Sequence, residues 1–214
     1  MTSTIQAVKN TLSAARMSTY VIAASNNERA ALELYAWNAQ VSGALLTPLH
    51  ICEVVVRNTV SETLESKYGD KWPWSQSFER SLTNPSVGYN QQKDLKNSRK
   101  KVTTTGQLIP ELKFVFWQKM FTARYDQRLW GQHLKQVLPN LDQAKTVSQL
   151  RKDIYDDLEQ IRKLRNRIAH HEPIFNRNLD DDFQKIVKLV EVRCQVTANW
   201  MVNNQQALDI IKAR

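Results

Sequence analysis

The stretch from about Thr146 to His171 constrains the fold most, because it has the pattern of one amphipathic helix. Ile161, Leu164 and Ile168 recur at intervals of three and four residues, which places them on a single buried stripe. Pro173 follows closely and cannot continue the helical hydrogen-bond ladder, so the helix is expected to end near His171. We therefore expect other helices to pack against this stripe.

The composition agrees with a helical chain. Among 214 residues there are 5 glycines and 6 prolines, too few for the many turns of a β-sandwich or barrel. We predict an all-α fold in one domain, in which residues 1–25 form an N-terminal extension and 69–106 an irregular insert. Further helices are expected at about residues 4–17, 28–43, 48–68, 111–122, 123–134 and 180–200.

Two prolines are expected at helix starts, where the missing N–H has no cost. Pro48 would open a helix that ends at Gly69, and Pro110 would open one that ends near Thr122. The second helix is apolar on almost every side, which suits either a central helix or an interface helix.

Cellular location is predicted from what the sequence lacks. No stretch approaches eighteen consecutive apolar residues, and the N-terminus has no apolar signal segment. Cys52 and Cys194 lie in apolar helical patterns and form no metal-binding or redox pair, so both are expected to be buried free thiols. These features predict a cytoplasmic protein that does not associate with a membrane.

The chemistry of the chain is concentrated at the end of the 146–171 helix. Asn166 and His170 are four residues apart and share a face, and the Arg165 side chain is long enough to curl toward them. An imidazole can take the proton of a ribose 2′-hydroxyl or protonate a leaving 5′-oxygen, while a guanidinium holds phosphate oxygens. Neither role needs a metal ion. The pair therefore suits phosphodiester cleavage in RNA, and the net charge of +9 fits such a polyanion.

A plainer interpretation fits the same residues. Acidic residues precede basic ones along this helix, an order that complements the helix dipole on a solvated face. The spacing also recurs at Arg128 and His133, where Gly131 interrupts the helical pattern. Spacing alone therefore does not identify a site.

The insert and the 48–68 helix each allow two interpretations. Trp72 and Trp74 precede a basic run at residues 93–101, so they could stack bases beside bound phosphates, or cover a core edge beside a solvated face. Glu53 and Arg57 form an i,i+4 pair that is either an ordinary surface pair or part of a functional site.

The segment 165–175, Arg-Asn-Arg-Ile-Ala-His-His-Glu-Pro-Ile-Phe, resembles the signature of the Abi-like (abortive infection) proteins of the HEPN superfamily. Ribonucleases of that superfamily carry an Arg, a polar residue directly after it and a His a few residues later, which Arg165, Asn166 and His170 match. The resemblance extends over roughly residues 30–190 and includes Glu53 with the Arg57-Asn58 pair. Val115 stands where the family pattern has Gly, and little between 72 and 106 matches.

The resemblance implies a HEPN-type helical bundle with additional N-terminal helices. It also implies a metal-independent endoribonuclease that needs no cofactor and acts as the toxin or effector of an anti-phage or toxin–antitoxin system. Its partners would be an RNA substrate, a second copy of the chain in a homodimer and an antitoxin made of RNA or protein. The alternative is a HEPN-fold module that binds RNA, a nucleotide or a partner protein without cutting.

The resemblance assigns roles to particular residues. Arg165 and His170 would be catalytic, with support from Asn166 and His171. The candidates for binding RNA are Arg162, Lys163, Arg167, Arg57 and Asn58.

Overall fold

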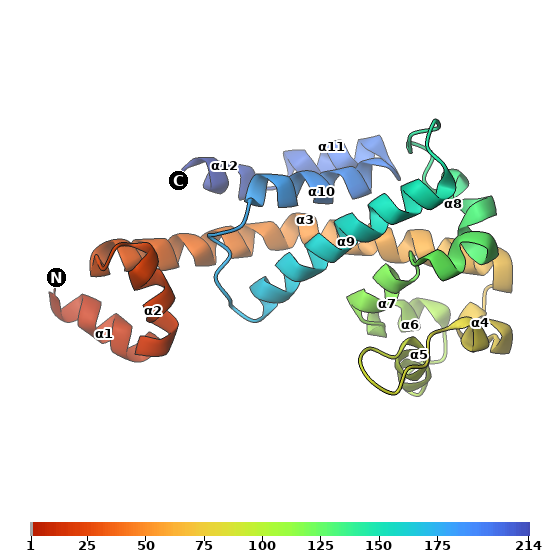
Figure 1. Cartoon of the computed structure of the whole chain (residues 1–214), viewed down its shortest axis with the longest axis horizontal. Coiled ribbons are helices and arrows are strands. Elements are labelled where there is room, and N and C mark those ends of the chain that lie inside the picture. Colours follow the sequence, from red (N-terminus) through yellow and green to blue (C-terminus); the bar gives the residue numbers. More distant parts are fainter. Residues whose placement is uncertain (1) are drawn as a thin grey trace.

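The computed structural model describes residues 2–214, and every regular element in that range is helical. The predicted all-α fold is therefore confirmed. Helix α3 (Glu28–Tyr68), 41 residues long, is the spine of the molecule, and α9 (Val147–Ala169) crosses it (Figure 1). Three further helices contact α3: α10 (Leu179–Glu191), α11 (Gln195–Asn203) and α12 (Ala207–Lys212).

Shorter helices occupy the two ends of the spine (Figure 1). The pair α1 (Thr2–Leu12) and α2 (Ala14–Ala23) lies at the N-terminal end of α3. The chain between α3 and α9 forms short elements near the other end: η1 (Trp72–Trp74), α4 (Gln76–Ser81), α5 (Gln91–Arg99), α6 (Thr105–Glu111), α7 (Phe114–Lys119), η2 (Ala123–Tyr125), the π-helical turn η3 (Asp126–Trp130) and α8 (Gly131–Val137).

Helix α3 passes through Pro48 without a break, so the prediction of two helices here is wrong. Its ends are as the sequence indicated. Asn27 caps the start by accepting a hydrogen bond from the Ala30 N–H, and Gly69, with a φ of 83°, ends it. The buried residues Leu45 and Leu49 on either side of Pro48 pack into the core, and this burial outweighs the hydrogen bond that proline cannot make.

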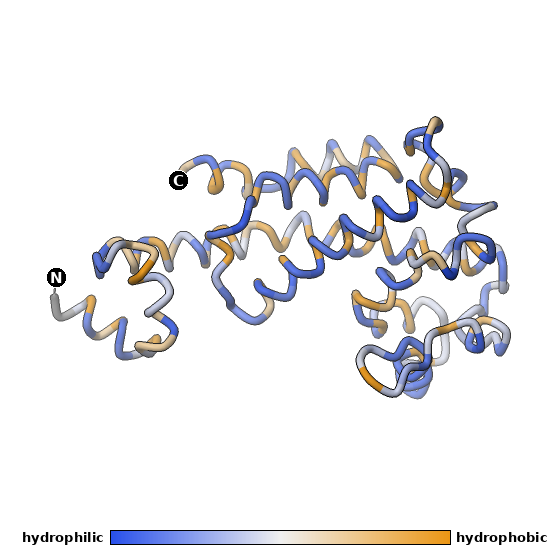
Figure 2. Tube along the Cα trace, viewed as in Figure 1, coloured by the Kyte–Doolittle hydropathy of each residue, from blue (hydrophilic) through white to orange (hydrophobic). Residues whose placement is uncertain are grey.

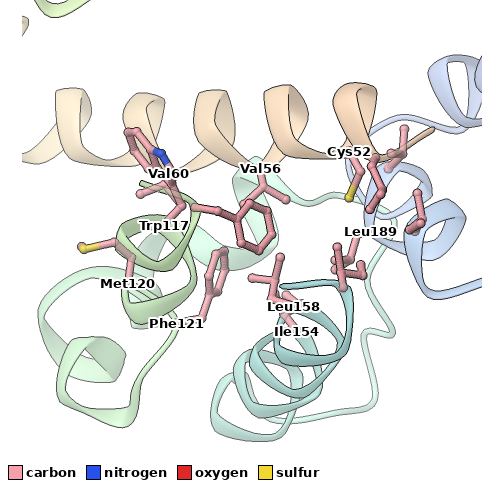
Figure 3. Packing of buried hydrophobic residues seen from close by; sticks show 14 of the residues in the cluster. Cys52, Val56, Val60, Trp117, Met120, Phe121, Ile154, Leu158 and Leu189 are labelled. Carbon is pink, nitrogen blue, oxygen red and sulfur yellow. The ribbon is translucent and has the colours of Figure 1, made fainter. Parts of the chain in front are cut away.

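The continuity of α3 produces one helix that is long and apolar enough to cross a membrane, by length and composition only. The helix contains an eighteen-residue window with a mean hydropathy of 1.4, which satisfies the length and composition of a span, and 33% of that window is buried. The central helix of a packed core passes the same test, and α3 supplies the buried stripe against which α7, α9 and α10 pack (Figure 3).

Other predicted boundaries differ because tertiary packing and local turns divide the helices. Ser13, at a φ of 73°, separates α1 from α2 within the helix predicted at 4–17. Pro110 lies inside α6 rather than opening the next helix, and α7 begins at Phe114. The final helix predicted at 180–200 breaks before Cys194, which is the N-cap of α11. The insert contains η1, α4, α5 and the start of α6 rather than irregular chain alone.

The core resolves two of the ambiguities in the sequence. Figure 3 shows Trp117 and Phe121 packed beside α3 residues Val56 and Val60. The large apolar side chains of the segment 114–121 are thus buried within the chain: Phe114, Phe116, Trp117, Met120 and Phe121. Trp72 is fully buried and its indole N–H donates to Ser61 at 3.1 Å, so it covers the core and is not exposed to stack on bases.

The two cysteines differ in burial. Cys52 is buried as predicted, and burial raises the pKa of its thiol to about 12. Cys194 is only half-buried, which differs from the prediction, and hydrogen bonding with Thr197 holds the pKa of its thiol below the usual range.

Candidate functional site

Helix α9 has the boundaries that the sequence predicted. Thr146 begins it through a capping box, in which its hydroxyl accepts from the Gln149 N–H while the Gln149 side chain accepts from the Thr146 N–H. Ile161, Leu164 and Ile168 are all buried on one stripe. Figure 2 shows hydrophobic and hydrophilic residues alternating along α9 as a one-sided stripe requires. Burial of this stripe fixes the rotation of α9 and leaves its other faces accessible.

Helix α3 supplies the groups that lie beside Arg165. The Arg165 Nε lies 4.0 Å from Glu53 Oε2, and Glu53 also forms an ion pair with Arg57. The Glu53 and Arg57 side chains are 15% and 18% exposed, whereas that of Arg165 is 43% exposed. One carboxylate therefore serves two guanidinium groups, and the cluster keeps a net positive charge. The Arg57 Nε is buried and has no hydrogen-bond partner in the described part of the chain.

His170 is the C-cap residue of α9 and is exposed. Its backbone N–H donates to the Asn166 carbonyl at 2.9 Å, which holds the last turn in place. Among residues 2–214, the imidazole has no hydrogen-bond partner, and the Nε of Arg165 lies beside Glu53. The arrangement offers a fixed cationic cluster for an anion and a nearby imidazole that is available for proton transfer.

The N-terminal extension reaches this end of α9. The guanidinium of Arg16 donates to the backbone carbonyl of His171 at 2.7 Å, and His171 has a left-handed φ of 55°. A hollow of about 280 Å³ opens beside this contact, and its lining includes Tyr20, Tyr35 and His171. No sequence pattern indicates a role for Arg16, because the contact joins residues 155 positions apart.

The three cations of α9 proposed to bind RNA already have carboxylate partners. Arg162 and Lys163 pair with Glu159 at 2.8 and 3.8 Å, and Arg167 pairs with Glu172 at 3.7 Å. Burial would raise the pKa of Glu159, but hydrogen bonds from Arg162 and Gln118 outweigh it and lower that pKa. Glu159 thus stays ionised and neutralises much of the charge predicted to attract phosphates.

Of the remaining candidate residues, Asn58 lies next to Arg57 in the sequence, whereas Arg128 and His133 belong to other elements. Asn58 is exposed and follows Arg57 on α3. Arg128 lies in the turn η3, before α8, at the end of α9 opposite His170 (Figure 1). His133 lies in α8 itself. Within residues 2–214, neither Arg128 nor His133 forms an ion pair, in contrast to Arg165 beside Glu53.

The part of the chain that the structure describes contains no group of three or more His, Cys, Asp or Glu side chains placed to hold a metal ion. No protein-family model matches the chain, and neither a curated protein nor a solved structure matches it.

Proposed function

We propose that this chain is a metal-independent endoribonuclease of the HEPN type, with Arg165 and His170 as its catalytic residues. One observation carries the proposal. The exposed end of α9 that presents His170 also brings Arg165 beside Glu53 and Arg57 of α3. These are the residues that the resemblance to Abi-like proteins groups together, although they come from segments more than 100 residues apart.

The proposed reaction uses the RNA itself as the nucleophile. An imidazole takes the proton from a ribose 2′-hydroxyl, whose oxygen then attacks the adjacent phosphorus. The bond to the 5′-oxygen breaks, and an imidazolium protonates that oxygen as it leaves. The products are a 2′,3′-cyclic phosphate and a 5′-hydroxyl. Arg165 binds the phosphate oxygens as their negative charge grows, with Asn166 and His171 in supporting positions.

Expression in bacteria tests this function directly. Wild-type protein should produce new 5′-hydroxyl ends in cellular RNA and slow growth, as expected of a toxin or an anti-phage effector in the cytoplasm. Its His170→Ala variant should do neither. If the wild-type protein binds RNA but creates no new ends, the chain is instead a non-catalytic binding module. An antitoxin, whether RNA or protein, would be found as the gene product that restores growth.

We further propose that the active form is a homodimer in which two α9 ends face one cleft. Each chain offers one exposed catalytic imidazole, whereas the reaction moves two protons, so a second His170 would act as the acid. Exposed apolar side chains on α3 support an interface there, because Leu46 and Val54 are 51% and 40% exposed and lie two turns apart.

Mixing subunits tests the shared site. Sedimentation should give twice the chain mass of 24.8 kDa. Wild-type protein mixed with an excess of His170→Ala subunits should lose activity, because most wild-type chains then lack an intact partner. The shared site is wrong if heterodimers retain the full activity of their wild-type subunit or if a stable monomer cleaves normally.

Glu53 is expected to position Arg165, so Glu53→Gln should slow cleavage by about 10²-fold, the cost of a small misplacement of a catalytic group. The change removes the negative charge that faces two guanidinium groups. Glu33→Gln is the matched control, because it removes another i,i+4 pair with an arginine, Arg29, on the same helix. Single-turnover rates for both variants test this role, which is excluded if Glu53→Gln cleaves as fast as Glu33→Gln.

A further inference from the structure

Cationic side chains gather around α5 and α7, away from the end of α9. Two hollows of about 510 and 640 Å³ adjoin there and share Asn84 in their linings. Among the residues that the structure describes, no carboxylate lines either hollow. We call the two hollows together the α5–α7 groove. Six cationic side chains line it: Lys93, Lys96, Arg99, Lys100, Lys119 and Arg124.

Nearby carboxylates offset only part of this charge. Glu79 pairs with Lys96 at 3.0 Å and with Arg99, and the hydrogen bond from Arg99 lowers the pKa of Glu79. Lys93, Lys100 and Arg124 are exposed, and none of them pairs with a carboxylate within residues 2–214. The groove therefore keeps positive charge that is available to a ligand, whereas the cations of α9 are largely neutralised.

The chemistry of the lining indicates the kind of ligand. The first hollow has only polar lining residues, and its amides, such as those of Asn84 and Asn97, can donate to phosphate oxygens or bond to sugar hydroxyls. A protein partner would need apolar or aromatic residues to anchor the centre of its interface, and this hollow supplies none. A sugar–phosphate backbone needs only charge and hydrogen bonds, so it fits the first hollow better, while the second hollow adds Leu82, Pro85 and Tyr89 to its cationic lining.

A continuous set of contacts joins the groove to α9. Lys119, in the groove, donates from Nζ to the Tyr155 hydroxyl at 3.2 Å, and the neighbouring Gln118 donates to Glu159 at 2.6 Å. Figure 1 shows α7 between α5 and α9. Tyr155 and His170 lie on one face of α9, connected at helical spacing through Glu159, Arg162 and Asn166.

The length of this face sets a scale for the ligand. Fifteen residues separate Tyr155 from His170, so the face is about 22 Å long at 1.5 Å per residue. That distance matches roughly six stacked nucleotides at about 3.4 Å each. An RNA cut at His170 would therefore have to extend several nucleotides from the cleavage point to reach Lys119.

We propose that the α5–α7 groove is a second RNA-binding site, which holds the phosphate backbone of the substrate several nucleotides from the bond that is cut. That the polyanion is RNA rests on the proposed ribonuclease function. The groove would provide most of the affinity for this RNA. RNA too short to span from His170 to Lys119 would lose these contacts and bind weakly.

The test removes charge from the groove and measures binding rather than cleavage. The triple variant Lys93→Gln, Lys100→Gln, Arg124→Gln is made in a His170→Ala background, so that the RNA stays intact. The matched control, Lys71→Gln, Lys212→Gln, Arg128→Gln, removes the same charge from exposed residues that line neither hollow. Dissociation constants are measured for single-stranded RNAs of about 20 and about 4 nucleotides over a range of salt concentrations.

The groove variant should bind the longer RNA more weakly, and its plot of log affinity against log salt should be shallower by about 2, from roughly 0.7 for each of three phosphate contacts. The control variant should keep the original slope, and the shorter RNA should bind both variants alike. Equal losses in the two triple variants, or an unchanged slope for the groove variant, would overturn the proposal. Because binding is read without cleavage, a protein that binds in this way but never cuts RNA would refute the nuclease function and leave the groove standing.

Discussion

His170→Ala is expected to slow RNA cleavage by about 10²–10⁴-fold, the usual contribution of a group that transfers a proton. The fold should be unaffected. The His170 side chain is exposed, and alanine keeps the backbone N–H that donates to the Asn166 carbonyl. Single-turnover rates and thermal unfolding of the same preparations measure both effects. Full activity in a normally folded His170→Ala protein would remove His170 from the mechanism.

The second Arg–His spacing supplies an internal control for this experiment. Arg128→Ala and His133→Ala change the same residue types at the same separation, but they lie at the opposite end of α9. Both variants should keep their activity. Arg165→Ala should lose activity as His170→Ala does, because it removes the guanidinium that is proposed to bind the phosphate oxygens. The variant should still fold, because a 4.0 Å ion pair of a side chain that is 43% exposed contributes little to stability. A loss caused by Arg128→Ala equal to that caused by Arg165→Ala would show that spacing, basicity or general damage explains the result.

Sequence patterns predicted the helix ends and the buried helix face that depend only on neighbouring residues. Asn27 and Gly69 mark the two ends of α3, and Thr146 marks the start of α9 through a cap that involves only its next three residues. The buried stripe of α9 follows from residue spacing, since a helix has 3.6 residues per turn wherever it packs. The positions of Arg165 and His170 at the end of this helix were predictable for the same reason.

Features set by tertiary packing were not predictable in this way. Pro48 ordinarily interrupts a helix, yet burial of neighbouring residues of α3 on both sides keeps this one continuous. The break before Cys194 interrupts a segment whose apolar pattern continues on both sides. In each case the outcome depends on residues distant in sequence, to which a periodicity argument has no access.

The candidate site, too, could be predicted from local sequence only in part. Glu53 and Arg57 could be associated with Arg165 only through the family resemblance, because nothing in their own spacing points to residue 165. The contact from Arg16 to the His171 carbonyl had no sequence signal. The pairing of Arg162 with Glu159 was visible as a helical spacing, but its consequence was missed: it neutralises a cation expected to bind RNA.

In the proposed cleavage reaction, the nucleophile comes from the RNA and no metal ion takes part. The most direct measurement uses two synthetic RNAs that differ only by a 2′-deoxy residue on the 5′ side of the cut bond, each incubated with purified protein in excess EDTA. The all-ribose RNA should be cut to a 2′,3′-cyclic phosphate and a 5′-hydroxyl, and the deoxy-substituted RNA should resist. Cleavage of the deoxy-substituted RNA at the same bond, or loss of all cleavage in EDTA, would contradict this mechanism.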